Sequence, residues 1–588
     1  MDQPNILEPL QASFQDASAP QKPHQVSSSK SLFALESNEM TTYRTTMQVP
    51  QVEEAKLEVD ALSVGFRCLL IDEIYEIVVR LLYGDGCGKG SVAALAITCR
   101  SFQPTAIKVL WGTLNSFAPL VKLLPRHEWY EVQRCDGSRA LDIRWGVKAA
   151  KLDLTRLQYY VGFIKRFSWR GNLDVRSGAV EYFLQRIPHS VRLFPRVSSF
   201  TFTDGLPEVS RLLLHRKAFV NPALLELHYE ALPSEARLLA EALDKVRKWC
   251  PKLCILRVPS YDDYIHVPTV IPKLSAIICV ANLRMFDSMV SITSEALLAL
   301  ARMPRLEIAN IRLGPDALNL WTVTCLPRRS FPALKSIALH MFDLDQASLL
   351  FLQRMGSERL MFFRVSSEIH PHNPQPLIAY FEALAAAPFA PIMQDLQLQF
   401  GHPEYVHAPL CSISLDVLQP LLSIKSLTTF VIRSRNYDLD DAGYRAIALA
   451  FPRIHTLLLH PRAAMDTDYP PAHMRSLRHF AEHCSNLAVL GLFIDVTDVP
   501  ELPEDFESQS LVSVYHFICH GPESYVGRAS AYLDAIFPRN ALRLEEARAH
   551  PEPGDYFVPP RAHSPRMPWT PAGVMDTVRG LYHRRRRS

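Results

Sequence analysis

The chain has 588 residues, which is enough for several domains or for one long array of repeats. Hydrophobic residues make up 48% of it and charged residues 21%, a composition that excludes a chain disordered throughout. The formal net charge of +3 excludes a general charge signal for nucleic acid or for a membrane surface.

The sequence carries no pattern that directs the chain into or across a membrane. Its apolar stretches are too short for a transmembrane helix, and its start lacks the basic-then-apolar order of a signal peptide. The eleven cysteines are odd in number and follow no framework, which predicts reduced thiols. We therefore expect a cytoplasmic or nuclear protein with no membrane and no nucleic-acid partner.

Both ends of the chain are predicted to be disordered. Residues 1–60 are rich in Gln, Ser, Pro and Thr and show no sustained periodicity. Residues 541–588 form a basic tail rich in Pro, Arg and His, with a short helix expected around Met575 to Tyr582. The tail ends in four arginines, which fit a targeting or phosphate-binding patch and equally a solvated tail with no role.

Residues 61–125 predict a small unit of three helices. The first helix carries apolar residues at helical spacing, and they form one stripe. The stripe consists of Ile71, Ile74, Ile77, Val78 and Leu81. The second helix runs through Val92 to Cys99, and the third carries Trp111. Because about fifty residues make a small core, this unit is expected to need a neighbour or a partner.

The residues of this unit resemble an F-box, and the ending LWGTLNSFAPLVKLLP resembles the F-box proteins of basidiomycete fungi. Ile71 stands where that family usually has proline. The resemblance implies docking on a Skp-type adaptor and, through it, on a cullin-RING ligase. It implies an adaptor-binding set of Leu69, Leu70, Glu73, Ile74, Ile77, Val78, Leu95, Cys99 and Arg100.

After a connecting region at 126–157, one phrase recurs through residues 158–540: an apolar residue, followed by others three and five positions later. The first residues of each copy are Val197, Leu224, Leu253, Leu283, Leu306, Leu334, Leu360, Met393, Leu427, Ile454, Leu487 and Leu511, with Ile164 beginning an earlier copy. Ile308 fits the phrase as well as Leu306 does. From Val197 onward the spacing averages about 28.5 residues, within the range of leucine-rich repeats.

Prolines and helical stretches support this repeat. Proline stands two residues before seven of these first residues, where it favours the start of an extended segment. Helical stretches lie between the copies, with Ser234 and Ser294 as expected N-caps. The cadence resembles a degenerate leucine-rich-repeat solenoid of the α/β class, with a curved parallel sheet and outer helices. The family's asparagine or cysteine eight residues into the repeat is mostly missing. A doubly wound α/β domain is the structural rival, but a dozen units exceed an ordinary sheet.

Alternation along a strand places the residues between the apolar positions on the concave face. We predict a polar set of mixed sign on or near this face, with an excess of basic groups: Arg257, Arg284, Asp287, His340, Arg364, Gln397, Arg433, His455 and His460. Of these, substrate contacts are predicted for Arg257, Arg284, His340, Arg364, Arg433 and His455. Solenoids bind proteins on such extended surfaces, although an ordinary solvated sheet face has the same pattern.

Three local patterns are weighed as sites for phosphate or metal. The run Gly84 to Ser91 misses the phosphate-loop spacing twice and is predicted to be a flexible inter-helix loop. Cys250 and Cys254 have no second ligand pair at zinc-site spacing and are interpreted as packing residues.

The third pattern, His479 to His483, matches the H-x-x-E-H motif of some zinc proteases. Leu477, Phe480, Ala481 and Cys484 are spaced to face the core, which puts both histidines on the outer surface. Glu501, Glu504 or Glu507 would have to supply a third ligand, and nothing selects one. We therefore interpret the segment as a solvent-facing helix end.

The leading hypothesis is a substrate-recognition subunit of a cullin-RING ubiquitin ligase, which is not itself an enzyme and needs neither cofactor nor metal. The alternatives are a repeat scaffold without a ubiquitin link, in which the helical unit only caps the solenoid, and a zinc hydrolase acting through His479 and His483.

Overall fold

A computed structural model gives the fold, and the chain divides into two units, Met1–Cys68 and Leu69–Ser588. The structure describes residues 71–84, 88–98, 100–134, 137–144, 153–169, 174–188, 191–203, 209, 211–213, 220–230, 236–258, 268–369, 371–401, 411–434, 437–461, 472–501, 514–515, 518–520 and 526–537. All of these belong to the second unit. The predicted disordered arm and tail lie outside the described residues.

The three predicted helices are present as α3 (Asp72–Gly84), α4 (Gly88–Thr98) and α5 (Gln103–Gly112). They contact one another and share a small apolar core. Tyr75 of α3 stacks on Phe102 with ring centroids 4.5 Å apart, and Val79 is fully buried. The glycine-rich run differs from the prediction in part, because Gly88 to Ser91 form the first turn of α4.

The helical unit runs directly into the long sheet. Helix α5 ends at Gly112, and the next two residues form β1 (Thr113–Leu114), which pairs in parallel with β4 (Arg166–Trp169). Trp111 stacks on Tyr160 of α7 (Leu154–Val161) with centroids 4.5 Å apart. The helices are thereby joined to the first strand without a linker.

Helix α6 (Ala118–Val121) follows β1 at the end of the helical unit. The connecting region then contains η1 (Arg126–Glu128) and an antiparallel pair, β2 (Trp129–Gln133) with β3 (Arg139–Ile143). Its charged residue Glu128 is 1% exposed and accepts from Arg186 of α8 (Ser177–Arg186) at 2.7 Å. This buried pair fastens the region to the first outer helix.

Sixteen strands of the described chain form one sheet, and every pair in it is parallel. Besides β1 and β4 they are β5 (Ser199–Phe202), β6 (Glu226–Tyr229), β7 (Ile255–Val258), β8 (Met285–Ser291), β9 (Ile308–Leu313), β10 (Ser336–Met341), β11 (Phe362–Ser367), β12 (Asp395–Phe400), β14 (Thr429–Ser434), β16 (Thr456–Pro461), β17 (Ala472–His473), β18 (Val489–Asp495), β19 (Val514–Tyr515) and β20 (Ile518–His520). Neighbours in the sheet follow chain order from β4 to β12, as a solenoid requires.

The predicted repeat phase is confirmed by the strand starts. Each strand from β5 to β12, together with β4, β14, β16 and β18, begins two residues after the predicted first residue of its copy. In the copy of β12, for example, Met393, Leu396 and Leu398 are at most 1% exposed. The structure also shows which residue is the first of the copy that contains β9. It is Leu306, which is fully buried, because Ile308 is the first residue of the strand itself. Leu511 lies outside the described residues.

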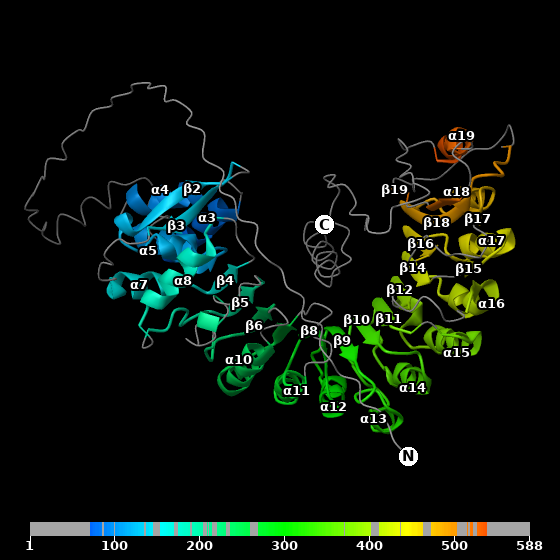
Figure 1. Ribbon diagram of the computed structural model, residues 1–588, viewed down its shortest axis with the longest axis horizontal. Coiled ribbons are helices and arrows are strands. Elements are labelled where there is room, and N and C mark those ends of the chain that lie inside the picture. Colours follow the sequence, from blue (N-terminus) through cyan, green and yellow to red (C-terminus); the bar gives the residue numbers. More distant parts are fainter. Residues whose placement is uncertain are drawn as a thin grey trace, which may run out of the picture. The chain divides into compact units, whose positions relative to one another are not determined.

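The helices between the strands follow one side of the sheet (Figure 1). They are α8, α10 (Ala236–Trp249), α11 (Ile271–Ile278), α12 (Ser294–Arg302), α13 (Leu320–Thr324), α14 (Gln346–Arg354), α15 (Pro374–Ala385), α16 (Leu415–Leu418), α17 (Asp441–Ala450), α18 (Ser476–His483) and α19 (Val526–Ile536), with the short turns η4 (Ala390–Ile392) and η5 (Gln419–Ser423). A separate strand pair joins β13 (Ile413–Ser414) to β15 (Tyr437–Asp438). The N-cap of α12 is Thr293 and not Ser294, because the Thr293 hydroxyl accepts from the amide of Ala296.

These features establish a leucine-rich-repeat-like solenoid of the α/β class with outer helices, as predicted. Within the described residues, no helix is both long enough and apolar enough to cross a membrane.

A polar side chain three residues before the first apolar residue links some copies to the preceding copy. The Asn221 side chain donates to the carbonyl of Val197, the first residue of the preceding copy, at 3.1 Å. In another copy, the Ser357 hydroxyl donates to the carbonyl of Leu334 at 2.6 Å. Each such contact satisfies a backbone carbonyl buried between two copies.

We expect Asn221→Ala to lower the free energy of unfolding by about 1–3 kcal/mol, because it leaves the Val197 carbonyl buried without that donor. Urea unfolding of the purified chain measures the change. Ser423→Ala, which removes an exposed hydroxyl, serves as the control and should change little. An equal loss in both variants would contradict the contact's role.

Candidate functional site

The first candidate surface is an exposed apolar stripe formed by helix α3 and by Ile71, the residue before it. Four of its residues are exposed although they are large and apolar: Ile71 by 47%, Ile74 by 39%, Ile77 by 58% and Leu81 by 66%. We call these four the α3 stripe. They recur every three or four residues, so they lie on one side of the helix.

The opposite side of α3 is also apolar, and it faces the helical unit's core through Tyr75 and Val79. The helix is held in this orientation by Glu76, which accepts from Lys108 of α5 at 2.5 Å and pairs with Arg80. The hydrogen bond from Lys108 lowers the pKa of Glu76. One apolar side of α3 is therefore packed in the core, whereas the α3 stripe on the other side is exposed.

The other predicted adaptor-binding residues differ in exposure. Glu73 and Arg100 are exposed, whereas Val78 and Leu95 are half-buried. Leu69, Leu70 and Cys99 lie outside the described residues.

The second candidate surface is the face of the sheet opposite the outer helices. Of the predicted substrate-binding residues, Arg257, His340, Arg364 and Arg433 stand at alternate strand positions on this face and are half-buried. Arg284 and His455 immediately precede β8 and β16 and are exposed, so they lie at the strand starts. Four of the six predicted residues therefore lie on the face itself.

A chain of polar side chains crosses the central strands on this face. Asp287 of β8 accepts from the Asn310 amide at 2.9 Å, and His340 of β10 lies 3.0 Å from the Asn310 carbonyl oxygen. Because that oxygen can only accept, the Nε2–H of His340 donates. Burial raises the pKa of Asp287 and lowers that of His340 to about 3, to which Arg364 and Arg312 contribute. His340 is therefore neutral in the folded protein near pH 7.

A small cavity of about 40 Å³ opens beside this chain. Ala338 contributes only a methyl group between Asn310 and Arg364 of the neighbouring strands, which leaves room there. Ser336, Asp395 and Gln397 also belong to the polar part of the lining. Burial raises the pKa of Asp395 to about 6, against the opposing effects of Gln397 and Arg364.

The cavity holds a few water molecules or one small side chain, and this size fits a single anchor of a bound protein. Within the described residues, the Oε1 atom of Gln397 is buried and has no hydrogen-bond partner. The residue-type reasoning missed Ala338, Asn310 and Asp395. The repeat phase contained the signal, because all three stand on the strand positions that face away from the outer helices.

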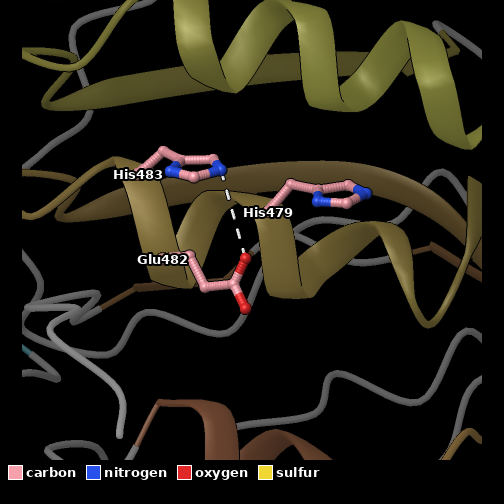
Figure 2. Close-up of side chains that lie close together, drawn as sticks. All are labelled: His479, Glu482 and His483. Atoms are coloured by element: carbon pink, nitrogen blue, oxygen red, sulfur yellow. Dashed lines mark ion pairs between the residues drawn. The ribbon is translucent and has the colours of Figure 1, made fainter. Parts of the chain in front are cut away.

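The third candidate site is the H-x-x-E-H segment of α18, shown in Figure 2. Leu477, Phe480, Ala481 and Cys484 are fully buried, as predicted. His479, Glu482 and His483 place one possible ligand atom each within 4.8 Å of one another. The third group is thus Glu482 within the motif, whereas Glu501 lies elsewhere and Glu504 and Glu507 are outside the described residues.

The two histidines are not simply solvent-facing. The side chain of His479 is 18% exposed, and its Nε2 lies 3.2 Å from Asp441 Oδ2 of α17. Burial alone would raise the pKa of Asp441, but hydrogen bonds from His479 and Ser476 lower it. Spacing within one helix could not reveal this contact, because Asp441 is 38 residues away in the chain.

Cys250 is buried, and burial raises the pKa of its thiol to about 11. Burial also raises the pKa of Cys254. Both thiols are therefore protonated near pH 7, which fits the predicted packing role.

Comparison with known proteins gives no family for this chain: no family model and no curated protein matches its sequence. Among solved structures it is similar to one described as the crystal structure of a TLR13–ssRNA13 complex, at 10% identity and a TM-score of 0.26. That match covers 62% of this chain and 63% of the other, so the chain spans less than two thirds of its structural neighbour. The solenoid assignment rests on the register of the chain's own strands.

Proposed function

We propose that this chain is the substrate-recognition subunit of a cullin-RING ubiquitin ligase and is not itself an enzyme. The α3 stripe docks on a Skp-type adaptor, and the helix-free face of the sheet holds a protein substrate. The observation that carries this proposal is the exposure of four large apolar side chains on one side of a helix whose other side is already packed.

The energetics favour a partner for the α3 stripe. Removing one such side chain from water is worth about 1.5–3 kcal/mol. Ile74 and Ile77 lie in the middle of the stripe, where anchors of an interface contribute most. The F-box resemblance of residues 61–125 names the partner class, an adaptor of the Skp type.

The junction between α5 and β1 supports the proposed mechanism. Because β1 begins at the residue after α5 ends, no linker separates the docking helices from the sheet. A substrate on the sheet would then be held at a fixed position relative to the ligase, and this proximity raises the effective concentration of its lysines.

A second candidate, a scaffold without a ubiquitin link, is favoured by the same junction. Stacking of Trp111 on Tyr160 lets the helical unit cover the first copy of the solenoid, as a capping unit does. Capping does not account for the α3 stripe, because that stripe remains exposed in the capped protein.

Co-purification of the full-length chain with a Skp-type adaptor tests the proposal. We expect the wild type to be captured and the Ile74→Asp/Ile77→Asp double variant to lose capture, because two charges would be buried at the interface without partners. Leu449→Asp is the matched control: it introduces the same charge at an exposed apolar residue, 53% exposed, on outer helix α17, and should retain capture.

Circular dichroism and thermal unfolding establish that the variants fold. Failure to capture the wild type would contradict docking on a Skp-type adaptor and would favour the scaffold without a ubiquitin link. Equal capture of the wild type and the double variant would show that the α3 stripe is not the docking surface.

A further inference from the structure

The H-x-x-E-H segment carries a second, independent inference. His479 and His483 are four residues apart on α18 and therefore share one side of the helix, with Glu482 beside them (Figure 2). Two imidazoles and one carboxylate within 4.8 Å form a ligand set of the type that holds Zn²⁺.

The three groups lie near, but not at, the spacing of ligands around one ion. His483 Nε2 lies 4.0 Å from Glu482 Oε2, whereas two ligands on one tetrahedral zinc are about 3.3 Å apart, given bonds of about 2.0–2.1 Å. Binding of one ion would therefore draw these two side chains closer together. His483 retains access from solvent, with 33% of its side chain exposed.

Asp441 of α17 stands where a supporting carboxylate is found in such sites. It accepts from His479 Nε2, which leaves the Nδ1 of that ring as the nitrogen for a metal. The carboxylate is itself fixed, because its other oxygen accepts from Ser476 at 2.9 Å. A metal ligand held by a carboxylate in this way is oriented and made more basic.

Two arginines oppose a cation here, and neither blocks the site. Arg478 Nε lies 2.5 Å from Glu482 Oε1, so Oε2, the oxygen nearer His483, is the one left for a metal. Arg475 lies 3.9 Å from Asp441 Oδ1, on the carboxylate and not among the three ligands.

We propose that His479, Glu482 and His483 form a binding site for a divalent cation of borderline softness, foremost Zn²⁺, with Asp441 positioning His479. The three protein ligands leave a fourth position for water. Through Asp441, the bound ion would fasten α18 to α17. This site is separate from the α3 stripe and from the helix-free face of the sheet.

The test is a zinc titration of the full-length, tag-free, reduced chain in competition with a chromophoric chelator. We expect the wild type to bind one equivalent of Zn²⁺ more than a Glu482→Gln/His483→Ala double variant. His455→Ala, which removes an exposed histidine outside the cluster, should bind as the wild type does. Counting the difference between variants separates this site from zinc bound by the cysteines.

Asp441→Asn provides the second arm. It should keep the number of zinc equivalents but weaken the affinity by about 10–100-fold, as loss of a supporting carboxylate does. Zn²⁺ should also raise the thermal midpoint of the wild type and not that of the double variant, because an ion that binds only the folded state stabilises it.

Equal numbers of bound zinc ions in the wild type and the double variant would overturn the proposed site. The proposal would also be overturned if His455→Ala lost as many zinc equivalents as the double variant does. An unchanged affinity in Asp441→Asn would overturn the role given to Asp441. If the double variant fails to fold, His483→Ala alone makes the same comparison, because its side chain is at the outer edge of the cluster.

Discussion

Replacing Phe167 by alanine is expected to lower the free energy of unfolding by about 3–5 kcal/mol. Phe167 lies in β4 and is 1% exposed. Its ring packs against those of Phe117, Phe194 and Phe200, with centroids 4.8, 4.5 and 5.5 Å away. Because each of these rings comes from a different segment, no single one can collapse into the space that alanine would leave.

The loss should be local, because each copy of a solenoid contacts mainly its neighbours. Hydrogen exchange should show lost protection in β1, β4 and β5 and retained protection in β12 and β14. Since α5 continues into β1, the helical unit should also lose protection from exchange.

Urea unfolding gives the magnitude for Phe167→Ala, and Phe342→Ala is the matched control. Phe342 is 48% exposed, so its removal should change stability by no more than about 0.5 kcal/mol. A uniform loss of protection along the whole sheet would contradict the local response.

The second large effect is expected from His340 and depends on pH. Its folded-state pKa of about 3 lies below the ordinary value of 6.5, so the folded protein holds the ring neutral. The stability contributed by this residue is complete above pH 6.5. It is lost as the pH falls, because the unfolded chain takes up a proton that the folded chain cannot bind until about pH 3.

His340→Gln removes this titration and preserves a donor to Asn310. Between pH 7 and pH 4.5 the wild type should lose roughly 2 kcal/mol more stability than the variant, since one pKa unit corresponds to about 1.4 kcal/mol. Urea unfolding at a series of pH values measures both curves.

Asp395 acts in the opposite sense, because its raised pKa of about 6 favours the folded state at low pH. It is present in both proteins, so the difference between the curves isolates His340. Parallel curves for the wild type and His340→Gln would contradict a buried neutral imidazole.

The α3 stripe and the H-x-x-E-H segment show opposite limits of reasoning from spacing. The periodicity of Ile71, Ile74 and Ile77 correctly identified one apolar side, but it could not say whether that side was buried. The structure shows that Tyr75 and Val79 take the core and leave the stripe exposed. For His479, the partner that sets its environment is Asp441 of another helix, which no local pattern could supply.

The repeat phase was determined by the sequence alone, because burial repeats along the chain with the geometry of the strands. An apolar residue followed by others at three and five positions marks where each strand begins, and for β5 to β12 the strand starts follow it without error. The inward and outward positions of each strand follow from the same alternation.

Only the tertiary structure decided which polar residues on the sheet meet. Asp287, Asn310 and His340 are each separated by more than twenty residues, and the parallel register brings them into one hydrogen-bonded chain. Their burial, and with it their pKa values, depends on neighbours from other strands. Local periodicity fixes the direction of a side chain along its own strand, whereas its partners are set by contacts between copies that are distant in sequence.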